Sequence, residues 1–546
     1  AKSPYDWTQW CGSASVRAEK VAVAGTSCNG LRTDVQFGGD TLRVENLRLQ
    51  LGTPGTVVSG RIDVQLPNGN RTQVQLDYDL SAYHRDATAP AQLAAFAGAV
   101  VWDPATARVS ARGEGTTRLA RAYHALGPAL GLQRHDRLAE YHCTGKPVRV
   151  RFTLPECGTD SDGWRVNAEA KGEGIRYRDL LVKEVESRVS IGKRQLSFTD
   201  LRGTTVGGEA FRLNLALSFS PFTLNVSDGE LRGNPLLVET FIQGRRPKQD
   251  YRHIWQGFTW DKEHPPLFRV PALLYRQEPK GGEWHLEMRG TGEFEEVTLH
   301  EVRAKRLTLG VKLDLPGTVS VSDVVFTTDD TVVKGNVQVN TDGVPSCDFQ
   351  IAAEDGGCDP RVVLRMIRPG LEENIGTMEF ASDSKVTCPG AFFLAKDPRL
   401  NLAGTVETKR WHWEDVGLTD VVAKWGLRGS EIRWDIAKAT CCKGTVQSTG
   451  VYDTVTRIGS LAIEGSGASL NAMMTEFELG EAKPENEAKV ALSGRVRFLR
   501  DWAGRPLQLA GTGRVVLSEG DLWRVGGYGT MGMARYSVTA DGGTIT

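Results

Sequence analysis

Apolar and polar residues alternate with a period of two along most of the chain. Clear runs occur at residues 74–80, 148–154, 211–219, 307–315 and 432–436, where the intervening residues are largely polar. Successive side chains of a strand point to opposite faces, so each run predicts a strand with one apolar and one polar face. The pattern therefore predicts a mainly β protein built from antiparallel strands.

The predicted strands fall into a degenerate repeating phrase. An alternating strand is followed by a glycine-bearing turn, a second strand and then a strand introduced by glycine. The first copy spans roughly Val16 to Leu66, and later copies begin at Trp164, Trp284 and Leu400, at intervals of 120 and 116 residues. Such self-similarity favours an elongated stack of similar units. We expect four β-repeat units, namely 1–158 with a helical insert, 159–280, 281–398 with a short helix, and 399–546.

A few segments have helical rather than strand-like features. Thr117–Leu130, Pro360–Ile375 and Ser469–Phe477 have helix-like apolar spacing, and they either cap the sheet or merely connect strands. The most apolar window, Leu93–Trp102, is shorter than the ~18–20 residues that a membrane helix needs. Its alanine and glycine content favours a packed helix. The 61 glycines, against 23 prolines, indicate many tight turns between strands.

Composition narrows the class of protein. Hydrophobic residues make up 40% of the chain and charged residues 24%, which indicates a folded protein. The formal net charge of −1 argues against nucleic-acid binding, because neutralising phosphates requires a basic excess. The length of 546 residues exceeds a single ordinary core.

Nine cysteines bear on the compartment and on metal binding. Three pairs are close in sequence and are candidate disulfides in an oxidising compartment: Cys11 with Cys28, Cys143 with Cys157, and Cys347 with Cys358. The alternative is that these cysteines are reduced and buried as small apolar side chains. No C-x-x-C motif occurs, so the spacing predicts no zinc site.

Motifs typical of enzymes are missing. The sequence has no G-x-S-x-G, no H-E-x-x-H and no G-x-x-x-x-G-K-[ST]. The segment from His135 to Cys143 is a local cluster of His, Asp, Glu and Cys, and we interpret it as a polar loop before a strand rather than a metal or nucleophile site. Glu295 and Glu296 are adjacent in a strand and should point to opposite faces, so they should not form a glycosidase pair. We predict no catalytic residue, metal or cofactor.

Two tryptophans offer one possible binding feature. Trp411 and Trp413 flank His412 and would share one face of a strand. Such a pair could stack on a sugar ring, as in a carbohydrate-binding module. Core packing and an interfacial aromatic belt are the alternatives.

The most specific motifs lie near the C-terminal end. They are GSGASLNAMMTEF (465–477), ALSGRVRFLRDWAGRPLQLAGTGRVVL (491–517) and SEGDLWRV (518–525). Upstream, DTLRVENLRLQL (40–51) and RQLSFTDLRGTTVGGEAFRLNL (194–215) share a rhythm of strand, D-L, G-G-x and strand. The chain resembles the AsmA-like, TamB–YhdP-type family of bridge-like lipid-transfer proteins. The resemblance covers most of the chain in rhythm and residues 465–525 in motif.

The resemblance implies a fold and a function. The fold would be an elongated, curled antiparallel β-sheet, a β-groove with short capping helices, although alternation alone equally allows a closed sandwich or barrel. The groove would bind and conduct lipid, with phospholipid as the expected cargo, between bacterial envelope membranes. The protein would be periplasmic, held at the inner membrane by an anchor that this chain lacks.

From the polarity of the strands we expect the groove to be lined by Leu213, Leu215, Leu217, Leu307, Leu309, Val311, Leu313, Ile432, Trp434 and Ile436. The alternative function is an extracellular adhesion or carbohydrate-binding β-protein, whose exposed aromatic residues would carry binding.

Overall fold

The computed structural model describes most of the chain. The described residues are 11–23, 26–51, 55–68, 72–85, 90–118, 121–122, 141–143, 146–158, 163–177, 180–219, 221–234, 257–277, 284–341, 346–353, 356–375, 378–393, 400–413, 416–476, 489–500, 506–518, 534–541 and 544–545.

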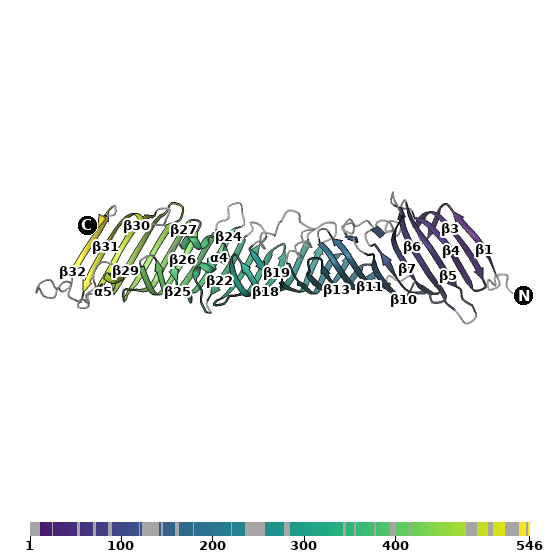
Figure 1. Ribbon diagram of the computed structural model, residues 1–546, viewed down its shortest axis with the longest axis horizontal. Helices are drawn as coiled ribbons and strands as arrows, with labels where there is room; N and C mark the ends of the chain where they lie inside the picture. The colour runs from purple at the N-terminus through teal and green to yellow at the C-terminus, as the bar shows by residue number, and fades with distance from the viewer. Residues whose placement is uncertain are drawn as a thin grey trace. The chain divides into compact units, whose positions relative to one another are not determined.

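The protein is mainly β and consists of antiparallel strands that follow one another as a meander (Figure 1). The chain divides into two compact units. Unit 1 comprises Ala1–Asp250 with Leu267–Leu286, and unit 2 comprises Tyr251–Pro266 with Glu287–Thr546. The four predicted repeat boundaries stay a prediction. The strands that begin at or next to the proposed repeat starts are long in each case: Arg165–Tyr177, Trp284–Leu299 and Leu400–Trp413.

In unit 1 most strands pair with the next strand along the chain, while β1 and β2 both pair with β3, β10 follows β8, β9 pairs with β11, and β17 follows β15. The strands are β1 Cys11–Ala18, β2 Val21–Val23, β3 Thr26–Gly38, β4 Thr41–Leu51, β5 Thr56–Gln65, β6 Val74–Arg85, β7 Pro90–Asp103, β8 Arg108–Thr117, β9 Tyr141–Cys143, β10 Val148–Gly158, β11 Arg165–Tyr177, β12 Leu180–Gly192, β13 Gln195–Thr205, β14 Ala210–Phe219, β15 Phe222–Arg232 and β17 Leu267–Gln277.

Unit 2 continues the same kind of meander, with β24 following β22 and β23 pairing with β25. Its strands are β16 Phe258–Trp260, β18 Trp284–Leu299 (mostly in this unit), β19 Val302–Leu315, β20 Thr318–Thr327, β21 Val332–Asn340, β22 Ser346–Ala353, β23 Glu379–Phe380, β24 Lys385–Phe393, β25 Leu400–Trp413, β26 Val416–Arg428, β27 Glu431–Cys441, β28 Gly444–Asp453, β29 Ile458–Ser469, β30 Lys489–Arg500, β31 Pro506–Ser518, β32 Ala534–Asp541 and β33 Thr544–Ile545.

The sheet differs from the predicted curled groove, because it is neither closed nor strongly curled. Two predicted helical segments do contain helices. They are α4 (Pro360–Ile367), followed by the 3₁₀ turn η5 (Leu371–Ile375), and α5 (Leu470–Glu476). Most of Thr117–Leu130 lies outside the described residues.

The apolar window Leu93–Trp102 was wrongly predicted as a helix. It lies within β7 and pairs in register with β6 on one side and β8 on the other. These ladder hydrogen bonds satisfy the backbone along both edges of the strand, and Gly98 leaves room for Tyr78, whose Oη would lie 2.7 Å from a Cβ at position 98. Pairing with two neighbours therefore overrides the local helix preference of alanine.

One residue in each of six strands has a left-handed backbone: Asn46, Asp200, Asp228, Glu296, Asp323 and Asp420, with φ between 47° and 53°. In β4 the register shifts between Val44 and Leu47. The apolar positions shift as well, from the even-numbered Leu42 and Val44 to the odd-numbered Leu47 and Leu49. A β-bulge adds one residue to a strand. The bulge therefore keeps the apolar residues before and after it on the same face.

The same arrangement explains the D-L rhythm of the sequence. In β13 the apolar positions change from Leu196 and Phe198 to Leu201 across the bulge at Asp200, where the pairing with β14 shifts. Asn and Asp tolerate the left-handed conformation better than most residues. At Asp200 the neighbouring strand stabilises the bulge further, because the Asp200 N–H donates to Asn214 Oδ1 at 2.8 Å.

Candidate functional site: the apolar face of the sheet

The strand register carries one row of apolar or small residues from one strand to the next across unit 1. Directly opposite residues lie on the same face of a sheet. One such row runs from β1 to β17 through Ala14, Val35, Val44, Ile62, Tyr78, Gly98, Gly113, Phe152, Ala168, Val189, Phe198, Leu215, Val226 and Leu273. The bulges are what preserve this continuity.

Unit 2 contains an equivalent row, from β19 to β29. Its members are apolar except for one serine: Leu307, Phe326, Val333, Ala353, Val386, Val406, Ala423, Ile436, Ser448 and Ile463. A second row of unit 2 begins with Val311, Val321, Val337 and Phe349 and reaches Ile432 and Tyr452. Each unit therefore has a broad, continuous apolar face.

Much of this face is only partly buried. Leu213, Leu215 and Leu217 on β14 are partly exposed, although their side chains are large and apolar. The main contacts between described strands run between strands that are neighbours in the ladder, and α4 and α5 are the described helices that pack on them. Within the described residues, no second sheet covers the apolar face. Large uncovered apolar surfaces are rare in proteins that bind nothing.

The ten predicted lining residues lie on β14, β19 and β27, and their role in lining a groove stays a prediction. On β14, Leu215 faces Phe198 and Val226, and Leu217 faces Leu196 and Leu224. The four from β19 alternate along the strand, from the buried Leu307 to the partly exposed Leu309, Val311 and Leu313. On β27, Ile436 is buried, whereas Ile432 and Trp434 are partly exposed.

The sequence analysis missed an aromatic residue that belongs to the same face. Trp425 on β26 lies directly opposite Trp434 on β27. The apolar positions of β26 change from the even-numbered Leu418 to the odd-numbered Val421 and Trp425, across the bulge at Asp420. This change from even-numbered to odd-numbered apolar positions was the sequence signal that could have placed Trp425 on the apolar face.

Glycines within strands shape this face. A Cβ at Gly404 would lie 2.6 Å from Nε1 of Trp425, and a Cβ at Gly113 would lie 2.9 Å from Cε1 of Phe152. Both distances are far below van der Waals contact, so the rings lie over these glycines. The prediction that glycine serves mainly in turns was incomplete. Glycine inside strands also lets aromatic rings from neighbouring strands lie flat on the sheet.

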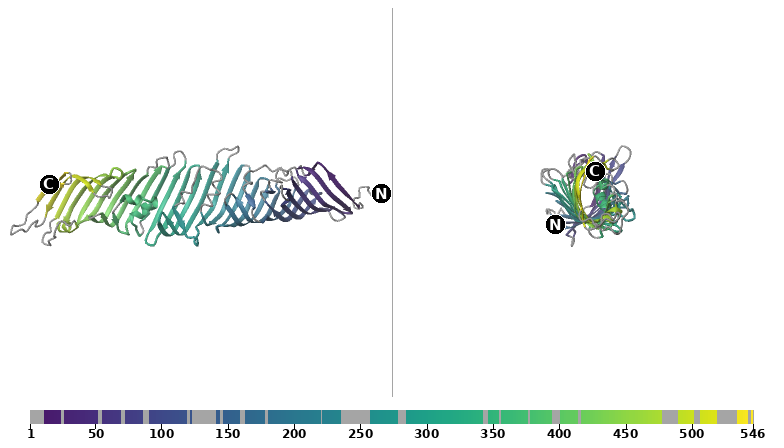
Figure 2. Two further views of the ribbon diagram at one scale, coloured as in Figure 1. Left: turned by 45° about the horizontal axis from the view of Figure 1, so that its top comes forward. Right: turned by 90° about the vertical axis from the view of Figure 1, so that its left-hand side faces the viewer.

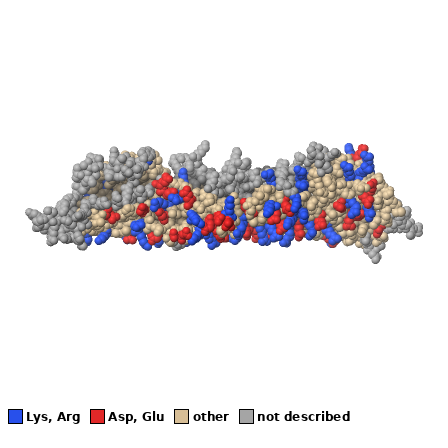
Figure 3. Space-filling view, viewed as in Figure 1, with Lys and Arg blue, Asp and Glu red and all other residues tan. Residues whose placement is uncertain are grey.

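The polar face has charges of both signs. Glu114, Arg151, Glu169 and Arg188 lie opposite one another on successive strands of unit 1, so the sign alternates from strand to strand. Ion pairs such as Arg43 with Asp63 at 2.8 Å join neighbouring strands. The view in Figure 3 shows Lys and Arg interspersed with Asp and Glu. Charges of opposite sign therefore face one another across neighbouring strands on this side of the sheet.

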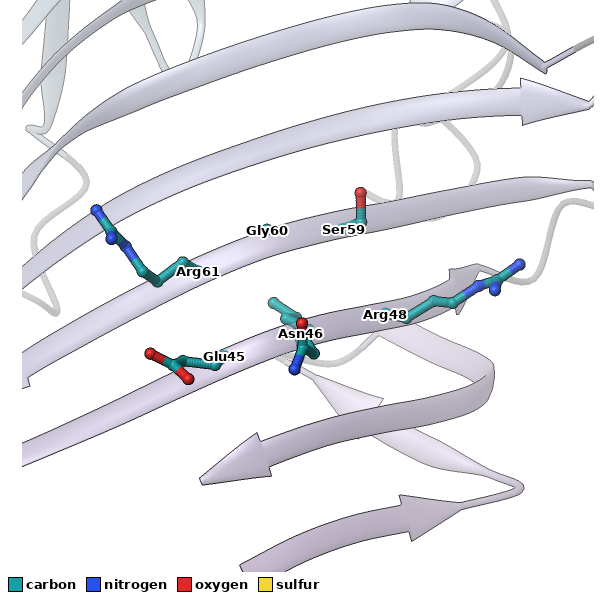
Figure 4. Close-up of a pocket in the computed structure, with 7 residues that line it drawn as sticks. Glu45, Asn46, Arg48, Ser59, Gly60 and Arg61 are labelled. Atoms are coloured by element: carbon teal, nitrogen blue, oxygen red, sulfur yellow. The ribbon is translucent and has the colours of Figure 1, made fainter. Parts of the chain in front are cut away.

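A shallow hollow on unit 1 lies at the bulge in β4 (Figure 4). It has a volume of about 480 Å³ and is lined by Glu45, Asn46, Leu47, Arg48, Ser59, Gly60 and Arg61. Asn46 Nδ2 donates to Asp34 Oδ2 at 2.8 Å, and Ser15 Oγ donates to Asp34 Oδ1 at 2.7 Å. These hydrogen bonds lower the pKa of Asp34. The hollow is therefore a by-product of the bulge, without a nucleophile and base side by side.

The three predicted disulfide pairs differ in where the structure places them. Cys347 and Cys358 are both buried thiols, and the side chain of Cys143 lies outside the described residues, so its pairing with Cys157 stays a prediction. Cys11 on β1 faces Gly38, whereas Cys28 lies ten residues away along the same partner strand. At about 3.3 Å per residue, that separation exceeds the reach of a disulfide.

Other sequence candidates can now be placed. Residues 135–140 of the His-rich cluster lie outside the described part of the chain, as do the side chains of His142, Cys143 and Trp413. Trp411 is buried and stacks on Phe380 with ring centroids 5.8 Å apart, which supports packing over sugar binding for this residue.

The prediction that Glu295 and Glu296 point to opposite faces was wrong. Phe294 and Val297 are both fully buried, and the bulge at Glu296 places two residues between them on the polar side. Glu296 accepts a hydrogen bond from Arg303 Nη2 at 2.8 Å, while Glu295 is exposed. Glu296 therefore has a structural role, because it forms an ion pair with Arg303.

Comparison with protein-family models, with curated proteins and with solved structures found no match. The resemblance to AsmA-like proteins therefore rests on the sequence rhythm. The described residues contain no group of three or more His, Cys, Asp or Glu side chains suited to a metal ion. No described helix combines the length and the apolar character needed to cross a membrane.

Proposed function

We propose that this protein binds lipid through acyl chains lying on the apolar face of its sheet, and that it conducts lipid between the membranes of a bacterial envelope. The observation that carries the proposal is the continuity of the apolar rows within each unit, combined with partial exposure of large side chains such as Leu215. A packed sandwich would bury these side chains under a second layer.

The physical chemistry of the face suits acyl chains. Each methylene removed from water contributes about 0.8 kcal/mol, so a lipid tail needs no specific polar contact to stay on such a surface. Because aromatic rings lie flat over glycines of neighbouring strands, they project little above the sheet. An open sheet can support the tail on one side while the headgroup stays in water. The proposed location is the periplasm, with attachment to the inner membrane.

The test is extraction and mass spectrometry of lipid from protein purified without detergent. A variant with Leu215→Asp and Leu309→Asp places charges on the apolar face of each unit, at positions that are only partly buried. The matched control is Ala216→Asp with Thr308→Asp. Ala216 follows Leu215 and Thr308 precedes Leu309, so the same charges lie on the same strands but on the other face.

We expect phospholipid on the wild type and on the control, and its loss from the apolar-face variant while the circular dichroism of all three stays alike. A lipid-free wild type would contradict the proposal, and glycan binding would then support the adhesion alternative. Equal lipid on both variants would show that the lipid lies elsewhere.

A further inference from the structure

A short helical segment lies on the apolar side of unit 2. The segment from Cys358 to Ile375 is inserted between β22 and β24, and it contains α4 and η5 (Figures 1 and 2). α4 packs against β19, β22 and β24, and so crosses the strands between them. Its Val363 and Leu364 are buried. We call residues 358–375 the cover segment.

The side chains of one apolar row are more deeply buried where the cover segment lies. The row members from β19 to β24 are at most 2% exposed: Leu307, Phe326, Val333, Ala353 and Val386. On the same strand as Leu307, the next apolar residues Leu309 and Val311 are only partly buried. Farther along the row, Val406, Ala423 and Ile436 are 5–7% exposed. Within this row, burial is therefore deepest from β19 to β24, the stretch that contains the three strands that α4 contacts.

Many of the polar contacts of the cover segment are internal. Asp359 Oδ1 accepts from the Arg361 N–H at 2.9 Å, and Arg365 Nε donates to Glu372 Oε1 at 2.8 Å, which joins α4 to η5. An eight-residue helix is marginal by itself, and these internal contacts help to hold it together.

Polar contacts also tie the cover segment to the sheet. The Cys358 N–H donates to Ser384 O at 2.7 Å, and His300 Nδ1 lies 3.2 Å from Met366 O. The part of the attachment that Val363 and Leu364 supply is apolar burial, which lacks directional constraint. A segment with these properties can leave the sheet as a unit.

We propose that the cover segment is a removable cover, and that the sheet face beneath it is a cryptic acyl-chain site. This inference rests on the proposed function. An acyl chain presents the same aliphatic surface as the buried Val363 and Leu364, so it can replace them on the strands that α4 contacts. Lipid that occupies the partly exposed rows would displace the cover to reach this margin.

Native thiols report the state of the cover. Cys388 on β24 is fully buried next to Val386 on the covered rows, and Cys358 is buried at the start of the segment. Cys347 on β22 is also buried, but it lies six residues from Ala353, toward the other end of the strand. Opening of the cover exposes Cys388 and Cys358, whereas Cys347, toward the other end of β22, stays buried.

The experiment is maleimide labelling of the full chain, resolved by peptide mass spectrometry, with and without vesicles of phosphatidylethanolamine and phosphatidylglycerol. Lipid extraction of the same samples measures binding. Val363→Asp puts a charge beneath the cover, and Val455→Asp puts the same charge in the exposed hairpin between β28 and β29.

We expect vesicles to accelerate labelling of Cys388 roughly tenfold or more while Cys347 stays slow, because labelling of a buried thiol follows the population of the open form. Val363→Asp should give the same pattern without vesicles, and Val455→Asp should match the wild type. If the protein carries lipid but Cys388 is still labelled slowly, the proposal of a removable cover is wrong and the proposed function remains. Absence of extractable lipid overturns both. If Val363→Asp exposes Cys347 as well, the variant is unfolded and the wild-type vesicle comparison decides.

Discussion

Trp434 on β27 lies over Gly450 on the neighbouring strand β28, so closely that a Cβ at position 450 would collide with its indole ring. Opposite Trp434, Trp425 lies over Gly404 in the same way. The two tryptophans therefore splay apart, each over a glycine. Together they form a low aromatic floor on the apolar face of unit 2.

Replacing Gly450 with valine should destabilise unit 2 by about 1–3 kcal/mol, since the added side chain forces Trp434 off the sheet. The measurement is urea unfolding followed by far-ultraviolet circular dichroism. Gly12→Ala is the control, because a Cβ there meets nothing within 4 Å. A Gly450→Val protein as stable as the control would show that the indole moves without cost.

The bulge at Asp420 should depend on its left-handed backbone, with φ of 52°. Asp420→Gly should be tolerated, because glycine adopts this conformation freely, whereas Asp420→Ile should cost about 1–2 kcal/mol. Deleting Asp420 should cost more than either, because the apolar residues before and after it would then face opposite sides. Urea midpoints of the three proteins test this order. Equal midpoints for the glycine variant and the deletion would contradict the role of the bulge.

Lipid with brominated acyl chains should quench the fluorescence of Trp425 and Trp434, if tails lie on the face that these rings share. The chain contains 13 tryptophans, so the comparison is between the wild type and the variant with both changed to phenylalanine. The variant should lose a large part of the quenching while keeping its lipid content. Unchanged quenching would place the acyl chains elsewhere.

Burial raises the pKa of the Cys388 thiol from 9.0 to about 12. In the unfolded chain this thiol ionises first, so between pH 9.0 and about 12 the unfolded state binds fewer protons than the folded state. Stability contributed by the neutral thiol is complete below pH 9.0 and is lost as pH rises, at about 1.4 kcal/mol per pH unit for one such group.

Cys388→Ala should therefore weaken the fall in stability at alkaline pH. The measurement is the urea midpoint as a function of pH for the variant and the wild type. Cys347, Cys358 and Cys442 also have raised pKa values, so part of the dependence should remain. Parallel curves would show that Cys388 ionises in the folded protein as it does in the unfolded chain.

The sequence by itself determined the strands and their two-faced character. Alternation such as Leu213, Leu215 and Leu217 depends only on the geometry of one strand, so it could be recognised without knowing any neighbour. The helices at 360–375 and 469–477 were recognisable for the same reason, since their apolar spacing is local. The phase changes at Asn46, Asp200 and Asp420 were also present in the sequence, but they acquired meaning only with the bulges.

Only the tertiary structure decided which residues face one another and which are covered. Leu307 is buried while Leu309 stays partly exposed, and α4, inserted about 50 residues later, packs on the same strand, which no local pattern contains. The same holds for Trp434 over Gly450, and for the separation of Cys11 from Cys28. Burial and contact are set by neighbouring strands and by helices inserted far along the chain, whereas alternation is set by the covalent geometry of each strand.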